Sequence, residues 1–360
     1  MWTFDAHLDL SMNAVEWNRD LTQTIEAVRT SEKPLTDKRD RGHGTVTLPE
    51  MRRGHVFGCV ATLIARVEHN AYSPVAGWRS PEQAWAITQA QRAWYRCMEE
   101  KQEMQLIASR SHLESFAVNL QANREGRGPS TFPIAFVLSL EGADSIVELD
   151  YVDRLHEMGV RAIGPAHYGP GRYAFGTDSD GSLGASGREL LKKMDELGMI
   201  LDVTHLCDQC YWEALDVYSG PIWASHQNCR SLVPHNRQFS DQQIQALVNR
   251  GGVLGVALDA WMLTPNWVRR VSTPEKHQVT LANVVDHIDR ICQIAGNDLH
   301  CGIGSDLDGA YGFEQTPMDV NTIADVSGIY PILKQRGFTE ESLQRIAHQN
   351  FLNFLTSALP

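Results

Sequence analysis

The side chains best suited to chemistry begin with a His-X-Asp triplet, His7-Leu8-Asp9, near the start of the chain. The triplet directly follows the strand-like segment 2–6. In a strand, residues i and i+2 point to the same face, so His7 and Asp9 can bind one metal ion while Leu8 packs on the opposite face. A single histidine at a strand end is more often structural than a ligand, so the triplet needs support from other residues.

Three further apolar runs end in a side chain that can bind a metal, namely 138–142, 200–205 and 221–226. With the triplet they supply five candidate ligands at predicted carboxyl ends of strands: His7, Asp9, Glu141, His205 and His226. Histidine and carboxylate side chains suit Zn²⁺, and a carboxylate that bridges two ions is a common way to hold a binuclear site. The repeated pattern therefore predicts a metal centre.

The elements that must position these residues alternate along the chain. We predict strands at 3–8, 56–64, 134–140, 161–166, 200–204, 221–225, 253–258 and 301–305. Amphipathic, helix-like segments lie at 80–101, 147–158, 187–197, 207–217, 241–250, 281–295 and 339–354. Eight strands in alternation with helices predict a single α/β domain over residues 1–360, a distorted (β/α)₈ TIM barrel. Such barrels gather their catalytic groups at the carboxyl ends of the strands.

Two long connections depart from a minimal barrel. Residues 10–55 are rich in charge, and residues 168–188 are rich in glycine. Long loops of this kind in compact domains are commonly functional, and both follow strands on the face where barrel enzymes place their active sites. We expect the glycine-rich segment, which begins beside His167, to cover a substrate.

Charge and composition restrict the partners. The chain has 32 Lys and Arg against 44 Asp and Glu, a net charge of -12. This balance argues against nucleic acid or an anionic membrane as the main partner and favours a small substrate. No run approaches the roughly 20 apolar residues of a membrane span, and the start of the chain lacks the features of a signal peptide. We therefore expect a cytoplasmic protein.

The seven cysteines are odd in number and lack the spacing of a disulfide framework, so we expect them to be reduced. Cys207 and Cys210 form a single CxxC at the start of a predicted helix, and we expect a structural role for the pair rather than a redox or zinc role.

The chemistry-bearing segments together resemble the renal (membrane) dipeptidase family, peptidase family M19. The resemblance is carried by His7-Leu8-Asp9, Glu141-Gly142, Thr204-His205, Ser225-His226, Asn236-Arg237, Ser240-Asp241 and the segment 304–309, Gly-Ser-Asp-Leu-Asp-Gly. It covers nearly the whole chain in the family's order, and the 21-residue step from His205 to His226 is similar to the family's. It implies a metal-dependent-hydrolase barrel that acts as a zinc-dependent dipeptidase with two Zn²⁺ per chain.

The resemblance assigns each matching residue a role. It implies that His7 and Asp9 hold the first zinc, that Glu141 bridges both ions, and that His205 and His226 hold the second.

For the reaction, the resemblance implies a metal-bridging hydroxide that attacks the peptide bond of L-Xaa-L-Xaa or L-Xaa-D-Xaa dipeptides. Asp306 would take the hydroxide's proton and pass it to the leaving amine. His167 would support the carbonyl oxygen, and Arg237 would bind the substrate's terminal carboxylate through its two-donor fork. These three residues are therefore also the expected substrate-binding residues.

The chain departs from the family pattern near the expected pocket. Many members have an Asn-Phe-Tyr-like segment where residues 256–261 lie here, and the Tyr position is Asp259. Gly142-Ala143-Asp144 replaces the Gly-Gly-His of the mammalian enzymes. Asp259 is either a partner for a substrate amine or a solvated loop carboxylate. We expect Asp308 to be structural and to orient the turn before Gly309.

Two other functions remain open from the sequence. The same metals suit a binuclear amidohydrolase acting on an N-acyl amino acid or a cyclic amide. A non-catalytic small-molecule-binding barrel is the alternative of another class, although a decayed enzyme would be expected to lose a ligand or Asp306. Trp78, Trp85 and Trp94 fit either a homodimer interface or the packing of an amphipathic helix within the chain.

Overall fold

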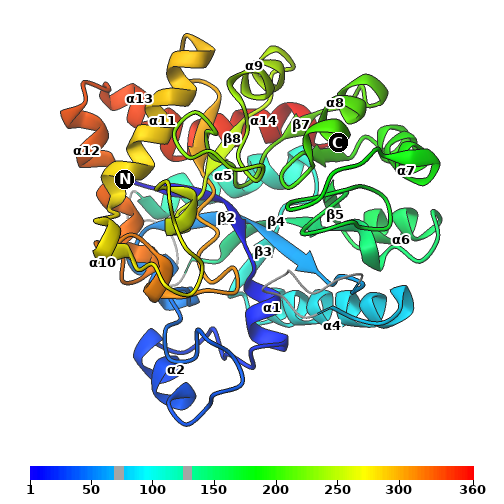
Figure 1. Cartoon of the computed structure of the whole chain (residues 1–360). Helices are drawn as coiled ribbons and strands as arrows, with labels where there is room; N and C mark the ends of the chain where they lie inside the picture. Colours follow the sequence, from blue (N-terminus) through cyan, green and yellow to red (C-terminus); the bar gives the residue numbers. More distant parts are fainter. Residues whose placement is uncertain (69–76, 125–131) are drawn as a thin grey trace. The chain divides into compact units, whose positions relative to one another are not determined.

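The computed structural model describes residues 1–68, 77–124 and 132–360 (Figure 1). The chain divides into two compact units. Unit 1 comprises Met1–Phe57 and Ala224–Phe351, and unit 2 comprises Gly58–Trp223 and Leu352–Pro360. Each unit alternates strands with helices, as predicted, and the single domain over 1–360 stays a prediction.

The strands of unit 1 are short and buried. They are β1 (Thr3–Leu8), β8 (Leu254–Val256) and β9 (Cys301–Ile303). Strand β9 pairs in parallel with both of the others, and Asp5 lies opposite Ile303. A parallel strand that is covered on both faces has a nearly continuous apolar sequence. This is why these strands could be predicted from the sequence.

Two glycines of unit 1 are required by the close approach of the backbone around β8 and β9. A Cβ atom at Gly255 would lie 2.0 Å from the carbonyl oxygen of Ser225, and one at Gly304 would lie 1.9 Å from the same oxygen. No side chain fits at that distance, so only glycine lets the segment after β7 pass beside these strands. The residue after Ser225 is the candidate ligand His226.

Unit 1 also contains eight α-helices among its described residues. They are α1 (Leu10–Val15), α2 (Ile25–Glu32), α3 (Leu48–Arg53), α9 (Asp241–Asn249), α10 (Pro274–His277), α11 (Leu281–Ala295), α12 (Ile329–Gln335) and α13 (Glu340–Gln344). The predicted connection 10–55 thus contains three short helices that the sequence did not reveal. Ser240 caps α9 in a capping box with Gln243, which sets the start of this helix at the predicted residue.

Unit 2 holds the longer run of parallel strands. They are β2 (Val56–Ile64, whose first two residues belong to unit 1), β3 (Met104–Leu106), β4 (Ile134–Glu141), β5 (Val160–Gly164), β6 (Ile200–Asp202) and β7 (Ile222–Trp223). The strand order is β2-β4-β5-β6-β7, and β3 also pairs with β4. Strand β3 was not predicted, because three residues are too few to show a period.

The helices of unit 2 follow its strands. They are α4 (Pro81–Glu100), α5 (Arg110–Arg124), α6 (Tyr151–Glu157), α7 (Gly184–Glu196), α8 (Asp208–Val217) and most of α14 (Asn350–Ala358). The prediction of one continuous helix over 339–354 is wrong, because a π-helical turn at Arg345–Gln349 separates α13 from α14.

The tryptophans near α4 are half-buried within unit 2. Trp85 meets Tyr151 of α6 edge to face at 4.8 Å, and Trp78 packs on a cluster formed by Ala65, Val67 and Ala84. Packing within the chain thus accounts for these two rings, and a homodimer stays a prediction. Among the described residues, no helix has both the length and the apolar composition that a membrane span requires.

The CxxC pair connects the glycine-rich segment to α8. The thiols of Cys207 and Cys210 donate to the carbonyl oxygen of Gly181 at 3.3 and 3.2 Å, and Phe175 N–H donates to the Cys210 sulfur. None of the seven cysteines, all of which the structure describes, forms a disulfide. These contacts agree with the expected structural role.

Candidate metal centre

Every candidate ligand lies at or just beyond the carboxyl end of a strand. Glu141 is the last residue of β4, and Asp9 follows β1 directly. His205, His226 and Asp306 each lie three residues beyond the ends of β6, β7 and β9. The predicted strand-end positions are therefore confirmed for the individual strands.

Unit 2 brings together Glu141, His167 and His205. Nε2 of His205 lies 3.3 Å from Oε1 of Glu141, and Nε2 of His167 lies 3.8 Å from the same oxygen. One potential ligand atom from each of the three residues lies within 4.8 Å of the others. The cluster thus groups an expected zinc ligand, the expected bridging carboxylate and the histidine expected at the substrate carbonyl.

A residue of the glycine-rich segment orients His205. Thr177 Oγ1 hydrogen-bonds Nδ1 of His205 at 2.9 Å, so Nε2 is the nitrogen that faces Glu141. Thr177 N–H also donates to the carbonyl oxygen of His167. Ligating histidines are commonly held through their second nitrogen in this way. The sequence alone does not reveal the role of Thr177, since a threonine among glycines carries no signal of its partner.

Unit 1 brings together His7, Asp9 and Asp306. Nε2 of His7 lies 3.8 Å from Oδ1 of Asp9 and 3.8 Å from Oδ1 of Asp306. These three residues also have ligand atoms within 4.8 Å of one another. The imidazole ring of His226 lies beside that of His7, with 3.6 Å between the ring centres.

Ser225 and Asp5 form hydrogen bonds to residues of the unit 1 cluster. Ser225 Oγ lies 3.2 Å from Nδ1 of His7 and 3.0 Å from Nδ1 of His226. Asp5 Oδ1 accepts the N–H groups of His7 and Ser305 at 3.1 and 2.8 Å. Burial raises the pKa of Asp5 to about 6. Ser225 was part of the sequence motif but had no role assigned to it, and Asp5 was not singled out.

Two site residues adopt a left-handed backbone. His205 has φ +69 and Asp306 has φ +58, a region that residues other than glycine occupy rarely. A Cβ at Gly309 would lie 2.2 Å from Oδ1 of Asp306, so glycine is needed for the Asp306 side chain to sit where it does. Such conformations persist only where surrounding contacts hold them, and they concentrate at functional sites.

Arg237 is buried in unit 1 and bonded to the segment after β7. Its Nη1 donates to Gln227 Oε1 at 2.5 Å and its Nη2 donates to the carbonyl oxygen of His226 at 2.8 Å. Gln227 Nε2 donates back to the carbonyl oxygen of Arg237 at 2.6 Å. The structure therefore shows what orients Arg237, and its role toward a substrate carboxylate stays a prediction.

Asp259 is 5% exposed, so the interpretation as a solvated loop carboxylate is wrong. Gln315 Nε2 donates to both of its oxygens, at 3.0 and 3.2 Å. Burial raises the pKa of Asp259 to about 7. Asp308, by contrast, has the structural contacts that were expected, because its carboxylate accepts from Thr45 and Val46.

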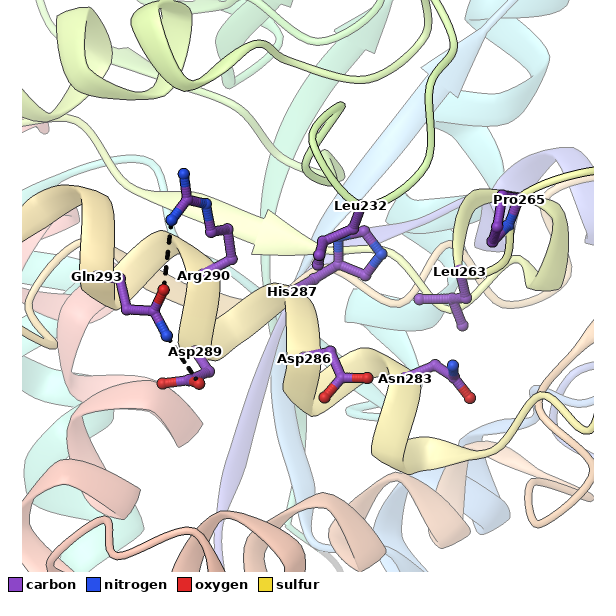
Figure 2. A pocket seen from close by; sticks show the side chains of 9 residues that line it. All are labelled: Leu232, Leu263, Pro265, Asn283, Asp286, His287, Asp289, Arg290 and Gln293. Carbon is purple, nitrogen blue, oxygen red and sulfur yellow. Dashed lines mark hydrogen bonds between the residues drawn. The ribbon is translucent and has the colours of Figure 1, made fainter.

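A pocket in unit 1 lies beside α11, and no predicted site residue lines it. Its lining includes Leu232, Pro265, Asn283, His287 and Arg290 (Figure 2). Two of its charged groups are already paired: Arg290 bonds Asp241 at 2.5 Å, and Asp286 bonds Arg336 at 2.7 Å. The pocket lacks the grouped imidazole and carboxylate atoms of the two clusters.

The residues present fit a zinc site in both chemistry and spacing. Zinc bonds to nitrogen and oxygen ligands are about 2.0–2.2 Å long, which places two ligand atoms of one tetrahedral ion about 3.3–3.6 Å apart. Around Glu141 the nitrogen–oxygen distances are 3.3 and 3.8 Å, and the distance from His7 to Asp9 is 3.8 Å. These distances are close to the value for zinc ligands and exceed the usual hydrogen-bond length. Each unit thus presents a donor set that a divalent metal can use.

The sequence and the fold match known proteins. The model of the membrane dipeptidase family, peptidase family M19, matches residues 1–358. Dipeptidase tcpJ of Claviceps purpurea is 30% identical over 229 residues, which cover 61% of this chain and 50% of that protein. The matched part is thus about half of that relative's length.

Two solved structures share the fold over the whole chain. Dipeptidase AC, a metallopeptidase of family M19, is 19% identical with a TM-score of 0.79, covering 100% of this chain and 99% of the other. A Rhodobacter sphaeroides metallopeptidase, solved with a phosphinate mimic of the dipeptide L-Ala-D-Ala, is 18% identical with a TM-score of 0.77 over 100% and 99%. With the parallel pairing inside each unit, these matches confirm the predicted α/β class, the distorted (β/α)₈ barrel.

Proposed function

Because this chain belongs to the membrane dipeptidase family, peptidase family M19, a family of metallo-dipeptidases, we propose that it hydrolyses dipeptides with two Zn²⁺ per chain. The membership confirms the resemblance seen in the sequence. One observation carries the proposal further: each unit groups histidine and carboxylate atoms at ligand spacing at its strand ends.

We assign the zinc ligands as the family resemblance implies. His7 and Asp9 would hold the first ion, His205 and His226 the second, and Glu141 would be shared. The spacings around His7 and around Glu141 support the two halves of this assignment separately. When bound, the ions would supply a nucleophilic hydroxide near neutral pH and polarise the peptide carbonyl.

The remaining site residues would move protons and bind the substrate. Asp306 has a side chain 16% exposed, so its carboxylate can both reach the site and exchange protons with solvent. His167 would donate a hydrogen bond to the carbonyl oxygen as negative charge develops there. Arg237, held by Gln227, would bind the terminal carboxylate and thereby restrict the enzyme to dipeptides.

The proposed substrates are L-Xaa-L-Xaa and L-Xaa-D-Xaa dipeptides. The Rhodobacter sphaeroides structure was solved with a mimic of L-Ala-D-Ala, which supports this dipeptide as the first to test. The net charge of -12 supports the further proposals of a small-molecule substrate and of no nucleic acid or membrane partner. The cytoplasmic location expected from the sequence stays a proposal.

The test combines metal analysis with hydrolysis of Ala-D-Ala. We expect about two zinc ions per chain, loss of activity on chelation, and return of activity with zinc. Asp306→Asn should retain the metal and lose most hydrolysis, because only the proton carrier is removed. Asp216→Asn, at an exposed carboxylate of α8, is the matched control. Full activity of Asp306→Asn or of the thoroughly metal-stripped protein would refute the proposal.

The contacts of Arg237 keep one alternative open, a binuclear amidohydrolase acting on an N-acyl amino acid or a cyclic amide. Arg237 donates to Gln227 and to the carbonyl oxygen of His226, so it has a structural task besides any substrate contact. In a dipeptidase, Arg237→Ala should impair dipeptide cleavage far more than cleavage of a neutral amide. Equal loss on both substrates would favour the alternative.

A further inference from the structure

One buried side-chain amide joins the two segments of unit 1 that carry Asp9 and Asp306. Asn13 lies on α1 and is 2% exposed. Its Nδ2 donates to the carbonyl oxygen of Asp9 at 3.0 Å and to that of Asp308 at 2.9 Å. The first carbonyl directly follows β1 and the second belongs to the turn after β9. A single amide group therefore connects the backbones on which two site carboxylates depend.

Arg19 determines which way this amide points. Its Nη1 donates to Asn13 Oδ1 at 2.7 Å, and because a guanidinium can only donate, the amide oxygen must face Arg19 and the amide nitrogen must face the two carbonyls. Arg19 is itself fully buried and held by Glu32 at 2.9 Å and by Asp40 at 2.9 Å. Two carboxylates therefore hold the Arg19 guanidinium in place.

The turn that Asn13 holds has an unfavourable backbone. Asp306, Asp308 and Ala310 all have positive φ, at +58, +61 and +64. Three non-glycine residues in this region within five positions need contacts that outweigh the local cost. Thr45 N–H and Oγ1 each donate to the Asp308 carboxylate at 2.7 Å, and the Asn13 amide holds the Asp308 carbonyl.

We propose that Asn13 is a positioning residue that sets the spacing of Asp9 and Asp306 about His7, and that Arg19 orients it. The inference rests on the proposed zinc chemistry. Without the Nδ2 donor, the carbonyls of Asp9 and Asp308 lose their common partner and the turn can relax. The side chains of Asp9 and Asp306 then lose their present placement. In this placement one carboxylate oxygen of each residue lies within 4.8 Å of the other and of a His7 nitrogen.

Two substitutions at Asn13 separate its donor from its volume. Asn13→Asp keeps the shape and the acceptor for Arg19 but replaces the donor by an oxygen facing two carbonyls, and Asn13→Ala removes the whole amide. Arg19→Lys tests the orientation. Arg41→Lys is the matched control. Like Arg19, Arg41 bonds the Glu32 carboxylate, at 2.7 Å, but it pairs with Asp37 where Arg19 pairs with Asp40.

The measurements are zinc affinity by competition with a chromophoric chelator, kcat and KM on Ala-D-Ala, and the thermal melt of the metal-free protein. Loss of a partner that orients ligands typically costs about 10- to 100-fold in metal affinity or activity. We expect such a loss of zinc affinity and of kcat for both Asn13 variants, a smaller change in KM, and a smaller loss for Arg19→Lys. The control should bind zinc as the unmodified protein does.

The outcomes distinguish the two proposals. If the unmodified protein binds zinc and cleaves Ala-D-Ala while both Asn13 variants match it, the positioning role is wrong and the proposed function stands. If Arg41→Lys loses as much zinc affinity as the Asn13 variants, Asn13 acts only through general stability and the inference is also wrong. If the unmodified protein binds no zinc, the proposed function itself fails. Should Asn13→Ala not fold, Asn13→Asp and Arg19→Lys decide the matter.

Discussion

Acid should destabilise this protein through one buried histidine, His287 of α11. The residue is 1% exposed, and its Nδ1 accepts the N–H group of Cys229 at 3.0 Å, so the ring is neutral with its proton on Nε2. Burial lowers the pKa of His287 to about 3. Figure 2 shows His287 on α11 among the residues that line the pocket.

The size of the effect follows from the two pKa values of this group. The pKa of His287 is depressed in the folded state from 6.5 to about 3, so between these values the unfolded chain binds a proton that the native state does not. Its stabilising contribution is complete above pH 6.5 and is lost as pH falls toward 3. At about 1.4 kcal/mol per pH unit, the loss between pH 7.5 and 4.5 is about 2–3 kcal/mol.

The assay is equilibrium urea unfolding at pH 7.5, 6.5, 5.5 and 4.5, followed by tryptophan fluorescence. His287→Asn keeps an acceptor for the Cys229 N–H group but cannot titrate. Both proteins are stripped of metal, because ligand protonation would otherwise release zinc in the same pH range. His112→Asn, at an exposed histidine, controls for the loss of one imidazole.

The expected result is a difference in slope. His287→Asn should be less stable than the unmodified protein at pH 7.5 because it leaves part of the ring volume empty, and this deficit should shrink by about 2–3 kcal/mol at pH 4.5. Parallel stability curves for the two proteins over the whole pH range would refute the reasoning.

Two further predictions concern unit 1. Burial raises the pKa of Asp259 to about 7, so the native state retains a proton that the unfolded chain releases, and this contribution to stability falls as pH rises from about 4 to 7. Asp259→Asn should therefore gain about 2–3 kcal/mol relative to the unmodified protein between pH 5 and 8, seen as a widening gap in melting temperature, whereas a constant gap would contradict the prediction. Gly304→Ala places a Cβ 1.9 Å from the Ser225 carbonyl oxygen and should cost at least about 1–3 kcal/mol in urea unfolding. Gly198→Ala, which meets only open space, should cost about 1 kcal/mol, so equal losses would show that the close approach is not what requires glycine.

Elements with strong local signals could be predicted, and short ones could not. Helix α11 begins and ends at the predicted residues, because its apolar period is long and Thr280 caps it. Helices α1 and α3 have six residues each and strand β3 has three, too few for a period to stand out. The helix predicted at 339–354 was divided by a π-turn, which depends on packing rather than on local sequence.

The types and positions of the site residues could be predicted, but not the partners that hold them. His205 could be placed at a strand end, whereas its bond to Thr177, 28 residues earlier, exists only after the glycine-rich segment folds back. Asp259 reads equally well as a solvated carboxylate in sequence, and only the fold shows that it is buried against Gln315.

The sequence by itself determined the set of chemical groups, their order and their place at strand ends, because strand periodicity and residue type are local properties. Only the tertiary structure decided which groups share a cluster within each unit, which nitrogen of His205 faces Glu141, and that Asn13 bonds the carbonyls of both Asp9 and Asp308. Most of these contacts join residues far apart in the chain, for example Asn13 and Asp308, which are 295 positions apart. No local pattern encodes them, since they arise only when strands and loops pack together.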